Sequence, residues 1–175
     1  MSFLSFFRKS QSISSIPLSG IIAPNMGRRK GLNLYELDKV IEQAFSVKNL
    51  KAVALQINSP GGSPVQSEMI SKRIRDLSED KNIPVLAFVE DVAASGGYWL
   101  ACAADEIFAS KASIIGSIGV VSSGFGFDKA IKKIGVDRRL YTSGENKAIL
   151  DPFLPENKDD IKRLKDIQKE LHNQF

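Results

Sequence analysis

Histidine and cysteine are nearly absent from this chain of 175 residues, which contains one of each, His172 and Cys102. A lone cysteine excludes an internal disulfide framework, and a single histidine beside it cannot supply the ligands of a structural zinc site. We therefore expect no metal and no other cofactor. His172 lies near the end of the chain in a run rich in Lys and Glu, where we expect it to be solvated and a poor base for a Ser-His-Asp triad. Cys102 lies among alanines and is expected to be buried and inert.

Long apolar runs and concentrated positive charge are lacking as well. No stretch approaches the ~20 apolar residues that a transmembrane helix requires, and the glycines form neither a Gly-x-Gly-x-x-Gly pattern nor a phosphate loop. The chain has 24 Lys and Arg against 20 Asp and Glu, which gives a formal net charge of +4, and these charges are scattered. Nucleic-acid binding needs a clustered basic stripe, so the sequence predicts no nucleic-acid partner and a cytoplasmic location.

Residues 1–15 are expected to form a flexible N-terminal tail. An apolar cluster comes first and Arg8 and Lys9 follow it, whereas in a secretory signal the positive charge precedes a longer apolar run. The alternative is a weak interfacial anchor, in which the two cations bind anionic lipid and the apolar side chains enter the headgroup zone; these side chains are Phe3, Leu4, Phe6 and Phe7. That alternative places the protein at the periphery of the inner membrane.

Apolar residues make up 43% of the chain, and its length suits one domain with a sizeable core better than two. Short apolar runs predict strands, and apolar residues at helical spacing predict helices between them. The expected strands cover 16–23, 52–57, 84–89, 106–109, 118–121 and 138–142, and the expected helices cover 34–45, 65–77, 130–134 and 161–175, with another that begins near Ser95. Alternating strands and helices predict an α/β fold with a mostly parallel sheet and flanking helices.

Two glycine-bearing turns are candidates for chemistry. Gly61 and Gly62 directly follow a buried strand, where backbone N–H groups can bind a carbonyl oxygen as it becomes an oxyanion. Ser95 lies at a strand-to-helix turn among small residues, which is the arrangement of a nucleophile elbow, and the N–H of Gly96 would be a second oxyanion donor. For each motif taken alone a structural interpretation is favoured: a tight turn at the glycines, and a helix N-cap at Ser95.

A serine nucleophile needs a base, and Lys147 is the better candidate by position. It precedes three apolar residues in a loop that contains Gly144. A lysine enclosed by apolar side chains loses hydration and can accept the serine proton as a neutral amine. Ser117, in another small-residue turn, could hydrogen-bond that lysine and orient it. The structural alternatives are an exposed lysine and a turn hydroxyl.

Taken together, the motifs resemble those of a known family. They are Asn58-Ser-Pro-Gly-Gly, Asp91-Val-Ala-Ala-Ser-Gly-Gly-Tyr, Ala103-Ala-Asp-Glu-Ile-Phe-Ala, Gly116-Ser-Ile-Gly-Val and Ser143-Gly-Glu-Asn-Lys. In this order they are similar to the peptidase S49 family of the signal peptide peptidase A type, in its short, single-repeat form. The resemblance runs from about Ile16 to the C-terminus, which makes 16–175 the expected peptidase domain.

The resemblance implies a ClpP/crotonase-like fold and a serine endopeptidase with a Ser-Lys dyad. Such an enzyme hydrolyses signal peptides or other hydrophobic peptides through an acyl-enzyme. Ser95 falls on the nucleophile, Lys147 on the general base and Ser117 on the lysine-orienting serine, while the oxyanion-hole segments contain Gly61, Gly62 and Gly96. The family assembles into homo-oligomeric rings in which a lysine of one repeat acts on the serine of its neighbour.

The family's closing segment, with Thr-Gly-x-x-Ala and Gly-Leu-x-Asp patterns, has no counterpart here. We therefore expect a peptidase domain that is C-terminally incomplete. One alternative is a catalytically inactive truncated fragment or an oligomeric scaffold. The other is a crotonase-type acyl-CoA enzyme, against which the pairing of Ser95 with Lys147 argues.

Overall fold

The computed structural model describes residues 10–25, 31–144 and 146–175. The apolar side chains of the expected interfacial anchor lie outside the described residues. The chain divides into two compact units, an N-terminal unit (Met1–Ile118) and a C-terminal unit (Gly119–Phe175), whereas the sequence predicts one domain from residue 16. In the part of the chain that the structure describes, no helix is both long and apolar enough to cross a membrane.

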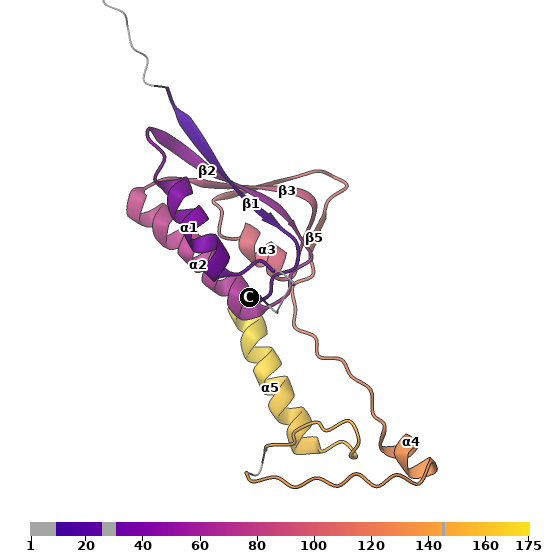
Figure 1. Cartoon of the computed structure of the whole chain (residues 1–175). Helices are drawn as coiled ribbons and strands as arrows, with labels where there is room; N and C mark the ends of the chain where they lie inside the picture. Colours follow the sequence, from indigo (N-terminus) through magenta and orange to yellow (C-terminus); the bar gives the residue numbers. More distant parts are fainter. Residues whose placement is uncertain (1–9, 26–30, 145) are drawn as a thin grey trace, which may run out of the picture. The chain divides into compact units, whose positions relative to one another are not determined.

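A five-stranded sheet forms the centre of the N-terminal unit (Figure 1). Its order is β1 (Ser12–Ser19), β2 (Leu50–Ser59), β3 (Val85–Ala94) and β4 (Glu106–Ala109), and β5 (Ile114–Gly116) pairs with the end of β3. Every strand pairing is parallel. The predicted α/β class and parallel sheet are therefore confirmed. β1 begins four residues before the expected strand, at Ser12, and it tolerates Pro17 because an edge strand has one side without a ladder.

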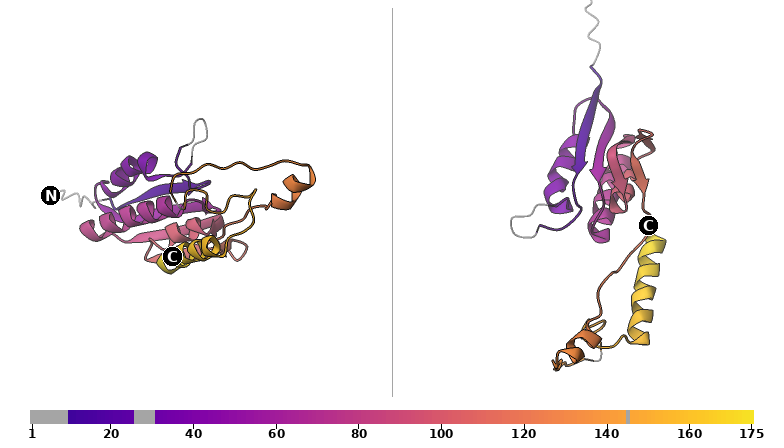
Figure 2. Two further views of the ribbon diagram at one scale, coloured as in Figure 1. Left: turned by 90° about the horizontal axis from the view of Figure 1, so that it is seen from below. Right: turned by 90° about the vertical axis from the view of Figure 1, so that its right-hand side faces the viewer.

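Three helices bury the inner face of this sheet. α1 (Leu34–Phe45) packs on β1 and β2, α3 (Gly96–Ala101) packs on β2 and β3, and α2 (Pro64–Lys81) packs on the other two helices. The alternation of side chains along each strand gives the inner face an apolar row, which on β2 consists of the fully buried Val53, Leu55 and Ile57. Figure 2 shows the helices and the sheet from two further directions. The core of the protein lies between these two layers.

Both α1 and α2 begin at a residue whose side chain caps the helix. Asn33 accepts a hydrogen bond from the N–H of Glu36 at 3.1 Å and caps α1. Ser63 accepts one from the N–H of Gln66 at 3.4 Å and caps α2, whose first residue is Pro64. A proline suits this position because the first N–H of a helix has no intrahelical acceptor. The helix that follows the Gly61-Gly62 turn thus begins at a fixed point.

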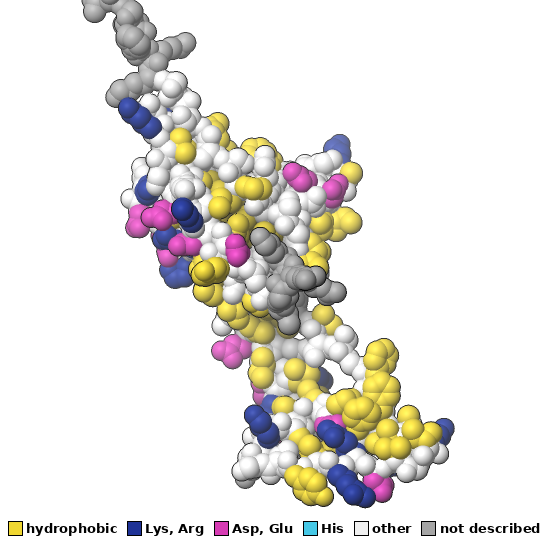
Figure 3. All heavy atoms as spheres, viewed as in Figure 1, with side chains coloured by type: hydrophobic (Ala, Val, Ile, Leu, Met, Phe, Trp, Pro, Cys, Tyr) yellow, Lys and Arg dark blue, Asp and Glu magenta, His cyan; other side chains and the backbone are white. Residues whose placement is uncertain are grey.

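The C-terminal unit contains α4 (Asp128–Lys133) and α5 (Lys158–Gln174). The strands predicted at 118–121 and 138–142 are wrong, since both segments are irregular, and the strand near the first one is β5, a few residues earlier. Among the described residues neither segment has a neighbouring strand, and a strand without one is not stable. None of the described residues of this unit is buried. Figure 3 shows many of its hydrophobic side chains at the surface.

One polar and aromatic cluster gives the C-terminal unit local order. Arg138 donates to the Asp151 carboxylate at 2.9 Å, and the other oxygen of that carboxylate accepts the N–H of Phe153 at 2.9 Å. The Phe153 ring stacks on Phe127 with 5.6 Å between centroids, and the Phe127 N–H donates to the Pro152 carbonyl at 2.6 Å. These contacts fix the segment directly after the loop that carries Lys147.

Candidate active site

Ser95 occupies a sharp turn between β3 and α3. Its backbone has φ 50° and ψ −124°, a conformation that costs a non-glycine residue about 1–3 kcal/mol. Three hydrogen bonds hold it there. The Ser95 N–H donates to the Gly116 carbonyl at 2.8 Å, and the Ser95 carbonyl accepts the N–H groups of Tyr98 at 2.8 Å and Trp99 at 3.1 Å. Strained strand-to-helix turns of this kind present a nucleophile.

The Ser95 side chain is not used as a helix cap. The residue stands at the N-cap position of α3, yet its side chain makes no capping hydrogen bond. The residue is half-buried, so part of its surface is exposed. Ser95 therefore stands at the N-cap position, as the sequence of this segment favours, but its side chain does not make the capping hydrogen bond. The strain at Ser95 is stabilised by its backbone hydrogen bonds and leaves the hydroxyl available.

The Gly61-Gly62 turn packs directly against this elbow. A Cβ on Gly61 would lie 2.7 Å from the Gly96 nitrogen and 2.9 Å from the Ser95 Cβ, and one on Gly62 would overlap the backbone of Ile22. A Cβ on Gly96 would lie 3.4 Å from the Gly62 nitrogen and would collide with the hydroxyl of Ser67. The glycines are required because backbone segments touch here. Gly61, Gly62, Gly96 and Ser95 thus form one cluster.

The N–H groups of this cluster differ in their hydrogen bonds. The Gly61 N–H donates to the Ser59 hydroxyl at 3.2 Å, and the Ser95 N–H is bonded to Gly116. Within the described residues, the N–H groups of Gly62 and Gly96 have no acceptor. Two free donors near a serine hydroxyl are the elements of an oxyanion hole. The third predicted glycine, Gly61, is not a free donor, because its N–H is already bonded to Ser59. Its lack of a side chain allows the turn to pack against the elbow.

Ser117 lies in the same unit as Ser95. β5 pairs Val92–Ala94 with Ile114–Gly116, so Ser117 directly follows the residue whose carbonyl binds the Ser95 N–H. Ser117 has φ 54° and is exposed. The fold therefore brings the Ser117 turn, the elbow and the two glycines together, although they are distant in sequence.

Lys147 belongs to the C-terminal unit, which is a separate compact unit from that of Ser95. Its backbone N–H donates to the Gly144 carbonyl at 3.4 Å, and its side chain is exposed. It lines a cavity of about 460 Å³ together with Arg138, Leu150, Asp151 and other residues of its loop. The described residues of its unit do not provide the apolar enclosure predicted for Lys147, because the apolar residues that follow it are themselves at the surface.

The remaining reactive side chains offer no alternative site. His172 lies in the last turn of α5 and is exposed, as expected. Cys102, the residue that directly follows α3, is exposed and not buried as predicted. Partial burial of its sulfur still raises the pKa of the thiol, and a hydrogen bond with Tyr98 opposes this. Among the described residues, no group of His, Cys, Asp and Glu could hold a metal ion.

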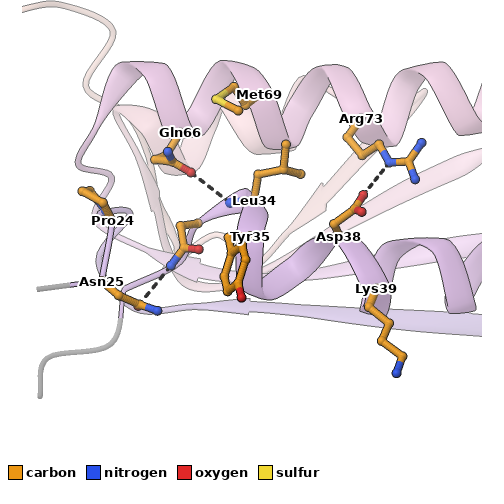
Figure 4. Close-up of a pocket in the computed structure, with 10 residues that line it drawn as sticks. Pro24, Asn25, Leu34, Tyr35, Asp38, Lys39, Gln66, Met69 and Arg73 are labelled. Atoms are coloured by element: carbon orange, nitrogen blue, oxygen red, sulfur yellow. Dashed lines mark hydrogen bonds and ion pairs between the residues drawn. The ribbon is translucent and has the colours of Figure 1, made fainter. Parts of the chain in front are cut away.

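A cavity of about 860 Å³ lies between the segment after β1 and the first turns of α1 and α2 (Figure 4). The Leu34 N–H donates to the Gln66 side chain at 2.9 Å and Arg73 donates to Asp38 at 2.7 Å, which joins α1 to α2. The Asn33 side chain donates to Asn25 at 3.1 Å, which joins the start of α1 to the segment after β1. None of the residues that line it is a serine, cysteine or histidine. The cavity therefore lacks the serine that a serine peptidase needs, and the elbow remains the candidate for catalysis.

A family model described as peptidase family S49 matches residues 78–175, which is more than half of the chain. The chain belongs to peptidase family S49. The matched range contains Ser95, Gly96, Ser117 and Lys147, while Gly61 and Gly62 precede it. Family membership agrees with the resemblance expected from the ordered motifs.

Several curated proteins are similar to this S49 chain. It is 30% identical to a putative signal peptide peptidase SppA of Enterococcus faecium over 174 residues, which are 95% of this chain and 49% of that protein. It is 39% identical to the chloroplastic serine protease SPPA of Arabidopsis thaliana over 126 residues, 68% of this chain and 18% of that protein. The S49 chain thus spans about half or less of these proteases.

Another relative has a different name. The chain is 56% identical over 147 residues to a protein of Brucella melitensis named Na(+)/H(+) antiporter NhaA, and the match covers 84% of this chain and 20% of that protein. Among solved structures, a mutant of the 1510-N membrane-bound stomatin-specific protease is similar with a TM-score of 0.47 and 20% identity, over 65% of this chain and 53% of that one.

Proposed function

We propose that this chain is a serine endopeptidase that hydrolyses signal peptides or other hydrophobic peptides through an acyl-enzyme, with Ser95 as nucleophile and Lys147 as general base. The observation that carries the proposal is the strained Ser95 turn, whose hydroxyl is not used as a cap and which lies beside the free N–H groups of Gly62 and Gly96. Membership of a peptidase family supports the reaction class.

The proposed reaction has two stages. Ser95 Oγ attacks the scissile carbonyl carbon, and its proton passes to the neutral amine of Lys147, while Gly62 and Gly96 donate to the oxyanion. The Lys147 ammonium then protonates the leaving amine as the C–N bond breaks, which leaves an ester on Ser95. Water, deprotonated by Lys147, attacks the ester, and the Lys147 ammonium returns the proton to Ser95 Oγ as the acid is released. Ser117 is proposed to hydrogen-bond the Lys147 amine and orient it.

We further propose a homo-oligomeric ring in which Lys147 of one protomer acts on Ser95 of its neighbour. Two observations support an intermolecular site. The dyad residues belong to different compact units, and Lys147 is exposed in the single chain. A neighbouring protomer would supply the apolar cover that a lysine base needs, because removal of water favours the neutral amine. If no neighbouring protomer covers Lys147, the alternative is a catalytically inactive fragment or an oligomeric scaffold.

Covalent labelling tests the proposal. The protein is incubated with a fluorophosphonate probe, and the adduct is measured by intact mass. We expect one adduct, no adduct in Ser95→Ala, and strongly slower labelling in Lys147→Ala. Lys169→Ala, which removes an exposed lysine of α5 in the same unit, is the matched control and should label like the parent. An unlabelled parent protein in its assembled state would exclude the active enzyme and leave the scaffold.

A further inference from the structure

Ser59 is the last residue of β2 and directly precedes the Pro60-Gly61-Gly62 turn. It is fully buried, although its side chain is polar. Its hydroxyl donates to the Gly20 carbonyl, just after β1, at 2.7 Å and accepts the N–H of Gly61 at 3.2 Å. One buried hydroxyl therefore joins the end of the edge strand to the turn.

One hydrogen bond holds each of the two peptide groups that flank Gly61. The Gly61 N–H is bonded to Ser59, and the Gly61 carbonyl accepts the N–H of Ile22 at 2.9 Å. The chain contains no cis peptide bond among the described residues. In a trans peptide the C=O and the following N–H point in opposite directions. Since the Gly61 carbonyl points at Ile22, the Gly62 N–H must point the other way, as a free donor.

The elbow packs on the same serine from the other side. A Cβ on Gly97, the second residue of α3, would overlap the Ser59 carbonyl and would lie 3.1 Å from the Ser59 Cβ. Ser59 thus contacts the helix that begins at Ser95 as well as the turn that presents Gly62. It holds the two halves of the candidate oxyanion hole against each other.

A second buried serine allows this role to be separated from simple core packing. Ser78 in α2 is 5% exposed, and its hydroxyl donates to the Ile83 carbonyl at 2.7 Å. Ser59 and Ser78 therefore make the same donor contact in similar burial. They differ because the Ser59 hydroxyl also accepts the N–H of an active-site residue.

We propose that Ser59 is a positioning residue that aims the Gly62 N–H at the oxyanion. The inference rests on the proposed peptidase function. Ser59 does not touch the reacting atoms. It acts through the Gly61 peptide groups, and loss of its hydroxyl would leave the Gly61 N–H without an acceptor and let the turn rotate.

The test compares Ser59→Ala with Ser78→Ala in the full chain by two measurements. The first is hydrogen exchange of the Gly61 amide by NMR, which reports the bond itself. We expect at least ~10-fold faster exchange in Ser59→Ala and no change in Ser78→Ala. The second is the rate of fluorophosphonate labelling of Ser95. Loss of one oxyanion donor lowers rates by about 10²–10³, so a misaimed Gly62 should lower this rate ~10-fold or more.

The outcomes are distinguishable. If Ser59→Ala labels as fast as Ser78→Ala, or if its Gly61 amide exchanges like that of the parent, the inference is wrong. A purely structural serine would lower the melting temperature in both variants and leave the labelling rate of the folded protein unchanged. If the parent protein does not label, the proposed function fails, and the Gly61 exchange alone decides whether the hydroxyl holds the turn.

Discussion

The two units of this chain differ in how their apolar residues are used. In the N-terminal unit, α1, α2 and α3 cover one face of a parallel sheet, and the whole buried hydrophobic core of the described residues lies there. In the C-terminal unit, no described residue is buried, although α5 has an apolar side and Ile167 is 55% exposed. Hydrophobic burial is the main stabilising contribution to folding. The Ser95 elbow therefore belongs to a well-packed unit, whereas the proposed base Lys147 belongs to a unit without buried residues among those described.

The two units should differ most in how much free energy of unfolding is lost when one isoleucine of each is replaced by alanine. Ile74 in α2 is fully buried, and Ile167 in α5 is mostly exposed. Ile74→Ala should lower the free energy of unfolding by about 2–5 kcal/mol, because it leaves a cavity in the core. Ile167→Ala should change it by less than ~0.5 kcal/mol in dilute protein. Urea denaturation of both variants measures this, and equal losses would show that α5 is covered in solution.

Alanine in place of one glycine in each unit should give a smaller difference in stability between the units. A Cβ on Gly96 would collide with Ser67, whereas a Cβ on Gly119 would meet nothing within 4 Å. Gly96→Ala should destabilise the N-terminal unit by about 1–3 kcal/mol, as overpacking does, and should slow labelling of Ser95. Gly119→Ala should leave both unchanged. Melting temperatures and labelling rates check this; normal labelling of Gly96→Ala would contradict the close packing of the elbow.

The smallest expected effect is on the pH dependence of stability, and it involves one carboxylate from each unit. The N–H of Val85 and then Arg75 lower the pKa of Asp105, and the N–H of Phe153 and then Arg138 lower the pKa of Asp151. A carboxylate with a lowered pKa in the folded state stabilises it above the unfolded pKa of about 3.9. That contribution is lost as the pH falls through the folded-state pKa.

Urea midpoints between pH 2 and 6 check this pair. Asp105→Asn should flatten the acid dependence of the unfolding of the N-terminal unit, because the lost charge no longer titrates. Asp151→Asn should instead free the loop that carries Lys147, which faster hydrogen exchange at the Phe153 amide would report. An unchanged acid dependence in Asp105→Asn would show that its contacts do not persist in solution.

The sequence predicts most of the N-terminal unit and less of the C-terminal one, for a physical reason. Periodicity locates α1, α2 and β4 well because their packing partners are in the same unit. The strands expected at 118–121 and 138–142 fail because a strand depends on a neighbour that its own residues do not specify. Small residues around Ser95 suggest an elbow, but only the structure shows its strained backbone and the missing side-chain capping bond. The buried hydroxyl of Ser59 has no sequence signal beyond its place before two glycines.

The bond from the Ser95 N–H to the Gly116 carbonyl also bears on when the site can form. The elbow needs this contact with β5, and the glycine turn needs Gly20 and Ile22 from the start of the unit. Contacts that join residues so far apart in sequence form late in folding, since the loops between them must close first. A partly synthesised or partly folded chain would therefore carry the serine without its strained geometry. The strained geometry of the elbow would arise only with the complete parallel sheet, since Ser95 and the glycine turn both depend on strands of that sheet.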